Sequence, residues 1–438
     1  MTENKTNILL QESIIKVRGA KFLQVSYNED TELPRLNEDT MPGILGDIVL
    51  ADCKDNEVDP MSVLLDVLSH FGTHVSNPYI EYRGFNQHCH MNFATVGNSS
   101  RACVGTSSNT ASRIFGKILD KPQYLEGHLS TGENLLNAVR DHIPSSANNR
   151  GNQVTLSPST SDKRLLFREN EISFAFANAK RPGNSLLETV SGLFKNGNAE
   201  LTVNSGKISA TAAHVSIFAR TSCTDFSALT NDANQSGEFA SHFLWFLVDR
   251  FKPVPRPKGM TDEEVESFRK RIERIILAAN SLERIEMSNT AWVLWDKIYP
   301  ALTKTEHGVA GIVVSRSEIH TIRLALLYAL VAERKRILAK DLGAAFALVQ
   351  YAQESASIIF KGDLRKNKDQ KILCALHVAP NHEMSRTEIS EIFGRNVDSG
   401  HIDLTLKMME KSKLIEIEKK DSKIGRKKTI IRLVSNKL

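Results

Sequence analysis

The sequence lacks the marks of a membrane or secreted protein. No stretch approaches the roughly 20 consecutive apolar residues that a membrane-spanning helix needs. The N-terminus has neither the basic start and apolar run nor the small-residue cleavage site of a signal peptide. The 5 cysteines are scattered and odd in number, which is no disulfide framework. We therefore expect a cytoplasmic protein with no membrane partner.

An excess of charge of one sign is absent from most of the chain. The 438 residues carry a net charge of +5. Residues 361–438 hold 18 Lys and Arg against 11 Asp and Glu, whereas residues 1–360 hold 38 basic and 40 acidic residues. The positive excess therefore lies in the last fifth of the chain, which favours a polyanion as its partner.

The pattern of apolar residues divides the chain into segments. Short strand patterns alternate with helical ones before the prolines at 253, 255 and 257, which predicts an α/β sheet covered on both faces. Helical patterns follow, the first opened by a capping box of Thr261 and Glu264. We predict an N-terminal arm (1–58), an α/β core (59–252), a helical extension (253–360) and a C-terminal winged helix (361–438).

The last segment has the element order of a winged helix. Helical patterns over 370–378, 385–393 and 399–412 precede two strand patterns, 414–418 and 429–434. In such a fold the third helix enters the major groove of DNA and the wing contacts phosphates. The candidate DNA-binding residues are Lys407, Lys411, Lys413, Lys419, Lys420, Lys423, Arg426, Lys427 and Lys428. A winged helix that docks a protein instead remains an alternative.

A glycine- and serine-rich segment follows the strand pattern at 90–96 and precedes a helical one. A phosphate-binding loop in this position needs glycines, a lysine for the phosphates and a Ser or Thr for Mg²⁺. Gly97, Gly105, Thr106 and Ser107 fit this pattern, but Val104 stands where the lysine belongs. Taken alone, the segment fits a plain Ser/Gly turn better.

Short segments that follow one another along the chain carry a family resemblance. They are Met41–Val49, Asp59–Gly72, Pro78–Gly84, His88–Gly97, Gly105–Ser107, Leu125–Asp141, Asp162–Glu171, Pro182–Leu186, Thr211–Ile217, Phe239–Trp245 and Ser315–Leu330. On these segments the chain resembles the helicase-like P-loop family of phages, plasmids and integrative elements, the YfjI-like group found as the helicase half of primase-helicases.

The resemblance implies a RecA-like P-loop NTPase core that uses ATP and Mg²⁺. It also implies a homo-oligomer, usually a hexamer, that acts in replication of a mobile element. By position, Gly97, Gly105 and Thr106 line the phosphate site. Glu169 and Glu171 stand where the family keeps its acidic pair, which holds Mg²⁺ through water and polarises the attacking water; a solvated acidic strand end is the alternative.

The sequence departs from the family at residues that hydrolysis needs. Val104 replaces a phosphate-binding lysine, Ser241 and His242 stand where an arginine finger is common, and Arg220 replaces a histidine. Impaired hydrolysis is therefore the prediction, with Arg101 as a partial substitute for the lysine. Two alternatives stay open: a non-catalytic adaptor in a defence or regulatory complex, and an active DNA-dependent ATPase.

A metal site is a weaker hypothesis. His88 and His90 share one face of an extended segment, but a site needs a further ligand such as Cys103. A structural role for the histidines is the simpler interpretation, and we assign no metal ligands.

Counterion release makes the DNA prediction testable. Affinity for duplex DNA is expected to fall steeply with salt, and exchange of Lys419, Lys420 and Lys423 for Gln should reduce the slope of log affinity against log salt by about 0.9 per lost phosphate contact. Fluorescence anisotropy over a salt series measures this slope. An unchanged slope would contradict the wing contact.

Overall fold

The structure is a computed structural model of the chain, and it divides into two compact units, Met1–Lys361 and Gly362–Leu438, each described by itself. The described residues are 11–17, 20–26, 34, 37–97, 104–141, 162–203, 206–222, 233–249, 254–304, 308–360, 372, 375–376, 379, 382–393, 399–411, 414–420 and 428–433.

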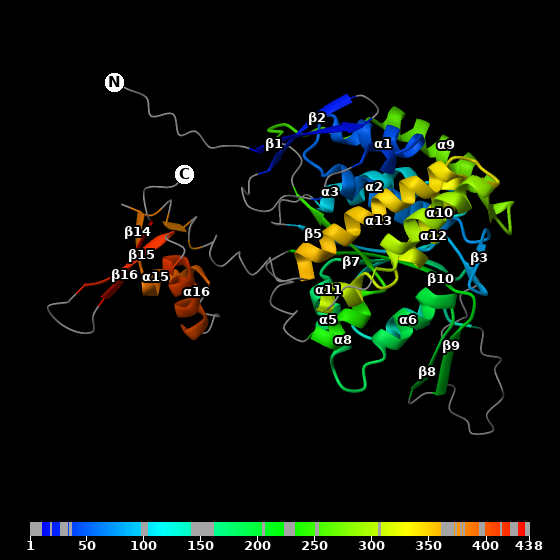
Figure 1. Ribbon diagram of the computed structural model, residues 1–438. Helices are drawn as coiled ribbons and strands as arrows, with labels where there is room; N and C mark the ends of the chain where they lie inside the picture. The colour runs from blue at the N-terminus through cyan, green and yellow to red at the C-terminus, as the bar shows by residue number, and fades with distance from the viewer. Residues whose placement is uncertain are drawn as a thin grey trace. The chain divides into compact units, whose positions relative to one another are not determined.

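A parallel five-stranded sheet forms the centre of the first unit (Figure 1). Its strands are β5 (Asn92–Gly97), β6 (Gln123–Gly127), β7 (Arg164–Glu169), β10 (His214–Ser222) and β11 (Leu244–Val248), in the order β11-β5-β10-β7-β6. The predicted α/β class is confirmed. After β5 the chain crosses to β6 at the edge of the sheet, and β7 and β10 then fill the positions between β6 and β5. The last strand, β11, lies on the other side of β5. Ligands of open parallel sheets bind at the carboxyl ends of the strands beside such a reversal.

Helices cover both faces of this sheet. In Figure 1, α1, α2, α3 and α13 lie on one side and α5, α6 and α8 on the other. Their bounds are α1 (Ile44–Cys53), α2 (Pro60–His74), α3 (Val104–Phe115), α4 (Gly132–Asn137), α5 (Ile172–Ala179), α6 (Leu186–Asn196), α8 (Ala233–Ala240), α9 (Asp262–Asn280), α10 (Asn289–Leu302), α11 (Gly308–Val313), α12 (Ser317–Val331) and α13 (Ala339–Phe360). A short 3-10 helix, η1, spans Glu38–Thr40.

Three antiparallel strand pairs and one short parallel pair complete the described strands of the unit. They are β1 (Gln11–Val17) with β2 (Ala20–Ser26), β3 (Ile80–Tyr82) with β4 (Phe85–Gln87), β8 (Ala199–Val203) with β9 (Gly206–Ala210), and the parallel pair β12 (Glu286–Met287) with β13 (Arg336–Ile337).

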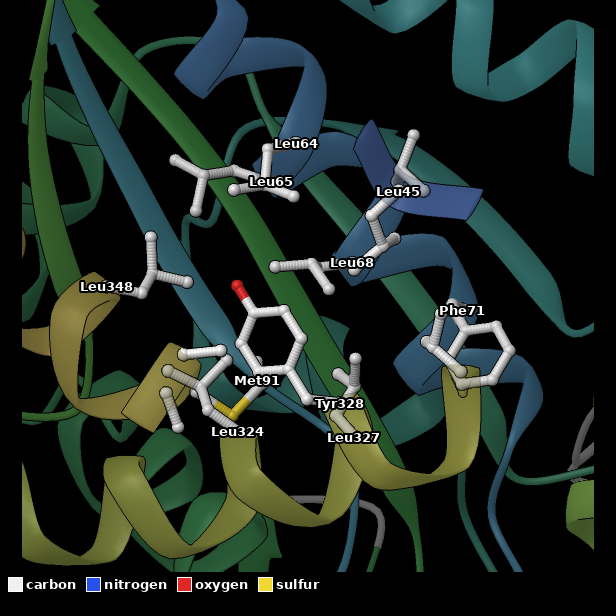
Figure 2. Close-up of a cluster of buried hydrophobic side chains, with 14 of the residues drawn as sticks. Leu45, Leu64, Leu65, Leu68, Phe71, Met91, Leu324, Leu327, Tyr328 and Leu348 are labelled. Atoms are coloured by element: carbon white, nitrogen blue, oxygen red, sulfur yellow. The ribbon is translucent and has the colours of Figure 1, made fainter. Parts of the chain in front are cut away.

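Helix α2 lies at the centre of the hydrophobic core. The Asp59 side chain caps α2 by accepting a hydrogen bond from the Met61 amide at 2.7 Å, and Pro60 occupies the first turn of the helix. All residues of α2 are buried. Figure 2 shows Leu64, Leu68 and Phe71 of α2 gathered with side chains of α12 and α13. Burial on every side explains why α2 carries apolar residues around its whole circumference.

The predicted arm over 1–58 is too long. Met41 and the α1 residues Ile44, Leu45 and Ile48 are buried in the same core as α2. The apolar residues of α1 need cover from water, and they obtain it by packing on α2. The main unit therefore includes residues that the sequence interpretation assigned to the arm.

The helices after the proline-rich segment belong to the first unit. The capping box of Thr261 and Glu264 opens α9, as the sequence predicted, and α9 buries Val265, Ile272 and Ile275. Helices α12 and α13 pack on each other, and α13 also packs along β11. The predicted helical extension is present as helices, but it shares one core with the sheet.

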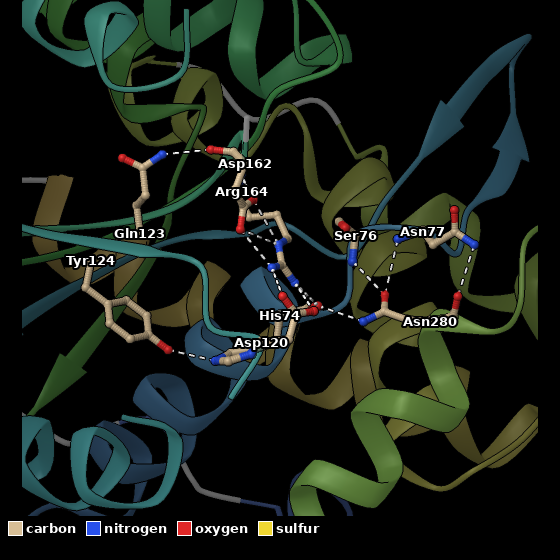
Figure 3. A network of polar contacts seen from close by, with 9 residues as sticks. All are labelled: His74, Ser76, Asn77, Asp120, Gln123, Tyr124, Asp162, Arg164 and Asn280. Carbon is tan, nitrogen blue, oxygen red and sulfur yellow. Dashed lines mark hydrogen bonds and ion pairs between the residues drawn. The ribbon is translucent and has the colours of Figure 1, made fainter. Parts of the chain in front are cut away.

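A polar network closes the amino end of the sheet (Figure 3). The Arg164 guanidinium, at the start of β7, donates to Asp120 at 2.6 Å and to Asp162 at 2.8 Å. Asn280 of α9 donates to the carbonyl oxygen of His74 and accepts from the Ser76 amide. These contacts join the end of α2 to α9 and β7 at the amino end of the sheet.

The C-terminal unit has three strands and two described helices. They are β14 (Glu383–Ser385), α15 (Arg386–Ile392), α16 (Ser399–Lys411), β15 (Ile415–Lys420) and β16 (Lys428–Leu433), with the antiparallel strand order β14-β16-β15. A capping box of Ser385 and Glu388 opens α15, and α16 buries Ile402, Leu406 and Met409, as predicted. Most of the predicted helix over 370–378 lies outside the described residues.

A buried cluster of histidines surrounds Arg323 of α12. The guanidinium donates to Gln87 at 2.9 Å, to Nε2 of His90 at 3.0 Å and to the carbonyl oxygen of Phe194 at 2.6 Å. Burial, with a smaller contribution from Arg323, lowers the pKa of His320 to about 3; burial also lowers the pKa of His214 to about 3. These histidines are therefore neutral in the folded protein at neutral pH.

The neutral histidines predict a loss of stability in acid. An unfolded histidine takes up a proton near pH 6.5, so the stability that His320 contributes is complete above pH 7 and declines as the pH falls from about 6.5 toward 3. Between pH 7 and pH 5 this amounts to about 2 kcal/mol per such histidine. Thermal unfolding of wild type and His320→Gln at both pH values measures it.

Other buried groups act in the opposite direction: burial raises the pKa of Asp59 to about 7 and of Asp66 to about 6, so these carboxyls make the fold more stable as the pH falls. Wild type and His320→Gln share these carboxyls, so the difference between the two proteins isolates the contribution of His320. His320→Gln should show the smaller decline in Tm between pH 7 and pH 5. Equal declines in the two proteins would refute the assignment.

Candidate functional site

The loop after β5 begins at the carboxyl edge of the sheet. Gly97 is the last residue of β5 and is buried, whereas Arg101 lies outside the described residues. Gly105, Thr106 and Ser107 form the first turn of α3, of which the backbone is described. Helix α3 packs mainly on α2 and α9. The predicted strand and helix on either side of this segment are therefore present, while residues 98–103 between them lie outside the described residues.

Strand register brings the candidate residues to the same edge. Gly97 of β5 lies opposite Ser222 of β10, while Ala219 of β10 lies opposite Glu169 of β7. Glu169 in turn lies opposite Gly127, the last residue of β6. The carboxyl ends of four neighbouring strands, β5, β10, β7 and β6, thus lie at one edge of the sheet, although they are far apart in the sequence.

Glu169 is fully buried, and hydrogen bonds occupy both of its carboxylate oxygens. Oε1 accepts from Nδ1 of His128 at 3.0 Å and from the Glu171 amide at 2.8 Å. Oε2 accepts from the Leu129 amide at 2.5 Å. A carboxylate only accepts, so the His128 proton must be on Nδ1. Glu169 therefore joins the ends of β6 and β7.

Glu171 has a more open environment than Glu169. It is partly exposed, and its Oε1 accepts from the Thr221 hydroxyl at 2.5 Å and from the Ser173 amide at 3.3 Å. The second contact caps the N-terminus of α5. Thr221 is the residue before Ser222, so Glu171 lies between the ends of β7 and β10, where a carboxylate fits an outer ligand of Mg²⁺. The sequence interpretation missed Thr221 and His128.

Buried charges lie beneath this edge. Arg168 donates to Asp66 of α2 at 2.8 Å and to Nε2 of His70 at 2.6 Å. Burial raises the pKa of Asp66 to about 6, while the positive charges of Arg168 and Arg220 act against that rise. Asp66 is the single Asp within α2, a signal that could have indicated such a pair but that the sequence interpretation did not use. Arg220 of β10 also acts on this cluster, because its positive charge favours the ionised form of Asp66.

The residues at the expected arginine-finger position are buried. His242 contacts the carbonyl oxygen of Glu238 through Nδ1 at 3.0 Å and packs on Phe194. Ser241 is also buried and accepts from Nε of Arg316 at 3.1 Å. Neither side chain presents a charge to a neighbouring molecule.

The metal hypothesis at His88 and His90 gains no support from the described part of the chain. His88 contacts the carbonyl oxygen of Pro78 at 3.1 Å, and His90 contacts Arg323, while Cys103 lies outside the described residues. Among the described side chains, no group of three or more His, Cys, Asp and Glu has a metal-binding arrangement.

The basic candidates of the C-terminal unit are only partly described. Lys407 is exposed on α16, where Asp403, Leu404 and Glu410 are exposed as well. Lys411 ends α16, and Lys420 pairs with Lys428 at the end of the β15–β16 hairpin that is next to residues 421–427. Lys419 is the residue before Lys420 on β15. Lys413, Lys423, Arg426 and Lys427 lie outside the described residues.

Comparisons with known proteins add no family assignment. No protein-family model matches the chain, and no curated protein sequence matches it significantly. Within the part of the chain that the structure describes, no helix is both long and apolar enough to cross a membrane.

The two glutamates are expected to respond differently to the same substitution. Glu169→Gln puts an amide NH₂ against a buried backbone N–H, because Gln has one acceptor oxygen in place of two. Its free energy of unfolding should fall by about 1–3 kcal/mol. Glu171→Gln retains an acceptor for Thr221 at a partly exposed site and should cost less than 1 kcal/mol, roughly. Urea unfolding compares the two, and equal losses would contradict the difference in environment.

Proposed function

We propose that this protein is a DNA-binding, helicase-related replication protein of a mobile genetic element, with a nucleotide site at the carboxyl edge of its sheet and impaired ATP hydrolysis. The observation that carries the proposal is the strand order and register, which put Gly97, Glu169 and the Glu171–Thr221 pair at the same carboxyl edge of one sheet.

The nucleotide site is supported by topology and by chemistry. The loop after β5 leads into the N-terminus of α3, and the backbone N–H groups of such a turn favour phosphate. Gly105, Thr106 and Ser107 form that turn. Glu171 is the acidic side chain open enough to hold Mg²⁺ through water, and its contact with Thr221 orients it.

Impaired hydrolysis is supported by three features. Val104 stands where a phosphate-binding lysine is expected, and a missing charge of this kind costs about 10³-fold or more. His242 is buried and offers no finger to a neighbouring subunit. Glu169 is also withdrawn from solvent and has hydrogen bonds at both oxygens.

DNA binding by the C-terminal unit is supported by its element order. Strand β14, helices α15 and α16 and the β15–β16 hairpin follow one another as in a winged helix, with Lys407 exposed on the helix that would enter the groove. One observation favours protein docking as a second candidate: Leu404 of α16 is 57% exposed and lies between Asp403 and Lys407.

Nucleotide binding and turnover test the proposal directly. Purified protein is expected to bind Mg·ATP in equilibrium titrations and to hydrolyse it slowly, with little stimulation by single- or double-stranded DNA. Arg101→Ala should weaken binding, and Glu169→Gln should remove the residual turnover. Rapid DNA-stimulated turnover would establish an active motor, whereas DNA binding without any nucleotide binding would leave the adaptor function.

A further inference from the structure

We propose that His128 and the Leu129 amide form a latch that holds Glu169 in a resting position, and that turnover at the proposed nucleotide site requires this latch to open. The inference rests on the proposed function, and it makes His128 a positioning residue that acts through Glu169.

The first step is the position of the carboxylate. In hydrolysis of the terminal phosphate, the water oxygen bonds to the γ-phosphorus, the bond to the bridging oxygen breaks with its electron pair on ADP, and the proton of the water passes to a base. Glu169 has the strand-end position of such a base, but it is fully buried and accepts three hydrogen bonds. In this position a water has no access to its oxygens.

The second step is the contrast between the donors. The Glu171 amide lies two residues along the same chain segment, so this contact is local. His128 and Leu129 come from the end of β6 and reach across to β7. Release of Glu169 therefore requires separation from the segment after β6.

The third step is the exposure of the His128 side chain to solvent. It is 54% exposed and packs on Phe174, which is itself 54% exposed, with ring centroids 5.0 Å apart. The His128 ring can leave Glu169 without opening the core. The Leu129 amide is less free, because Asn184 donates to the carbonyl oxygen of the next residue, Ser130, at 2.8 Å. The exposed histidine is thus the part of the latch that substitution can remove.

Two substitutions of His128 separate the latch from a structural role. His128→Asn keeps a donor close to the position of Nδ1, whereas His128→Ala removes it, and both lose the ring contact with Phe174. In His128→Ala we expect the turnover number for Mg·ATP to rise at least 3-fold with an unchanged KM, and amide hydrogen exchange at Leu129 to accelerate. His128→Asn should match wild type in both measurements, and His128→Ala combined with Glu169→Gln should show no gain.

The outcomes distinguish the latch from the function beneath it. Turnover in His128→Ala that is equal to or below wild type, with Mg·ATP binding intact, overturns the latch and leaves the nucleotide site standing. Unchanged Leu129 exchange in His128→Ala overturns it as well, without reference to nucleotide. Absence of Mg·ATP binding in wild type refutes the proposed function and, with it, any regulation of turnover by His128.

Discussion

The buried guanidinium of Arg323 joins segments that are remote in the sequence. From α12 it reaches Gln87 in β4, His90 before β5 and the carbonyl oxygen of Phe194 in α6, and its plane lies over the Phe194 ring. Among the described residues no carboxylate pairs with it. A buried charge without an anion is tolerated only where neutral acceptors surround it, so these segments must stay together for the core to form.

The histidines around Arg323 extend the same constraint to the sheet. His90 packs on His214 with ring centroids 5.0 Å apart, and Nε2 of His214 contacts the carbonyl oxygen of Gly72 in α2 at 2.6 Å. A side chain at Gly72 would collide with the backbone of Cys89, so glycine lets α2 approach β5. The amino end of the sheet is therefore closely packed against α2.

At the carboxyl edge of the sheet, stability and catalysis make opposite demands on Glu169. Three donors and complete burial stabilise the ends of β6 and β7, whereas a general base needs an accessible oxygen. Glu171 and Thr221 meet the second demand better, because they are less buried and lie nearer the end of β5.

The sequence by itself determined the α/β class, the capping boxes of α9 and α15 and the buried face of α16, because periodicity and capping are local properties of the chain. It also placed Gly97 and Glu169 at strand ends, with Glu171 just beyond the second of these strands. Only the tertiary structure decided that α1 belongs to the core, that Glu169 is held by His128, and that Thr221 meets Glu171. These facts depend on strand order and register, which bring residues more than 40 positions apart into contact and leave no local pattern in the sequence.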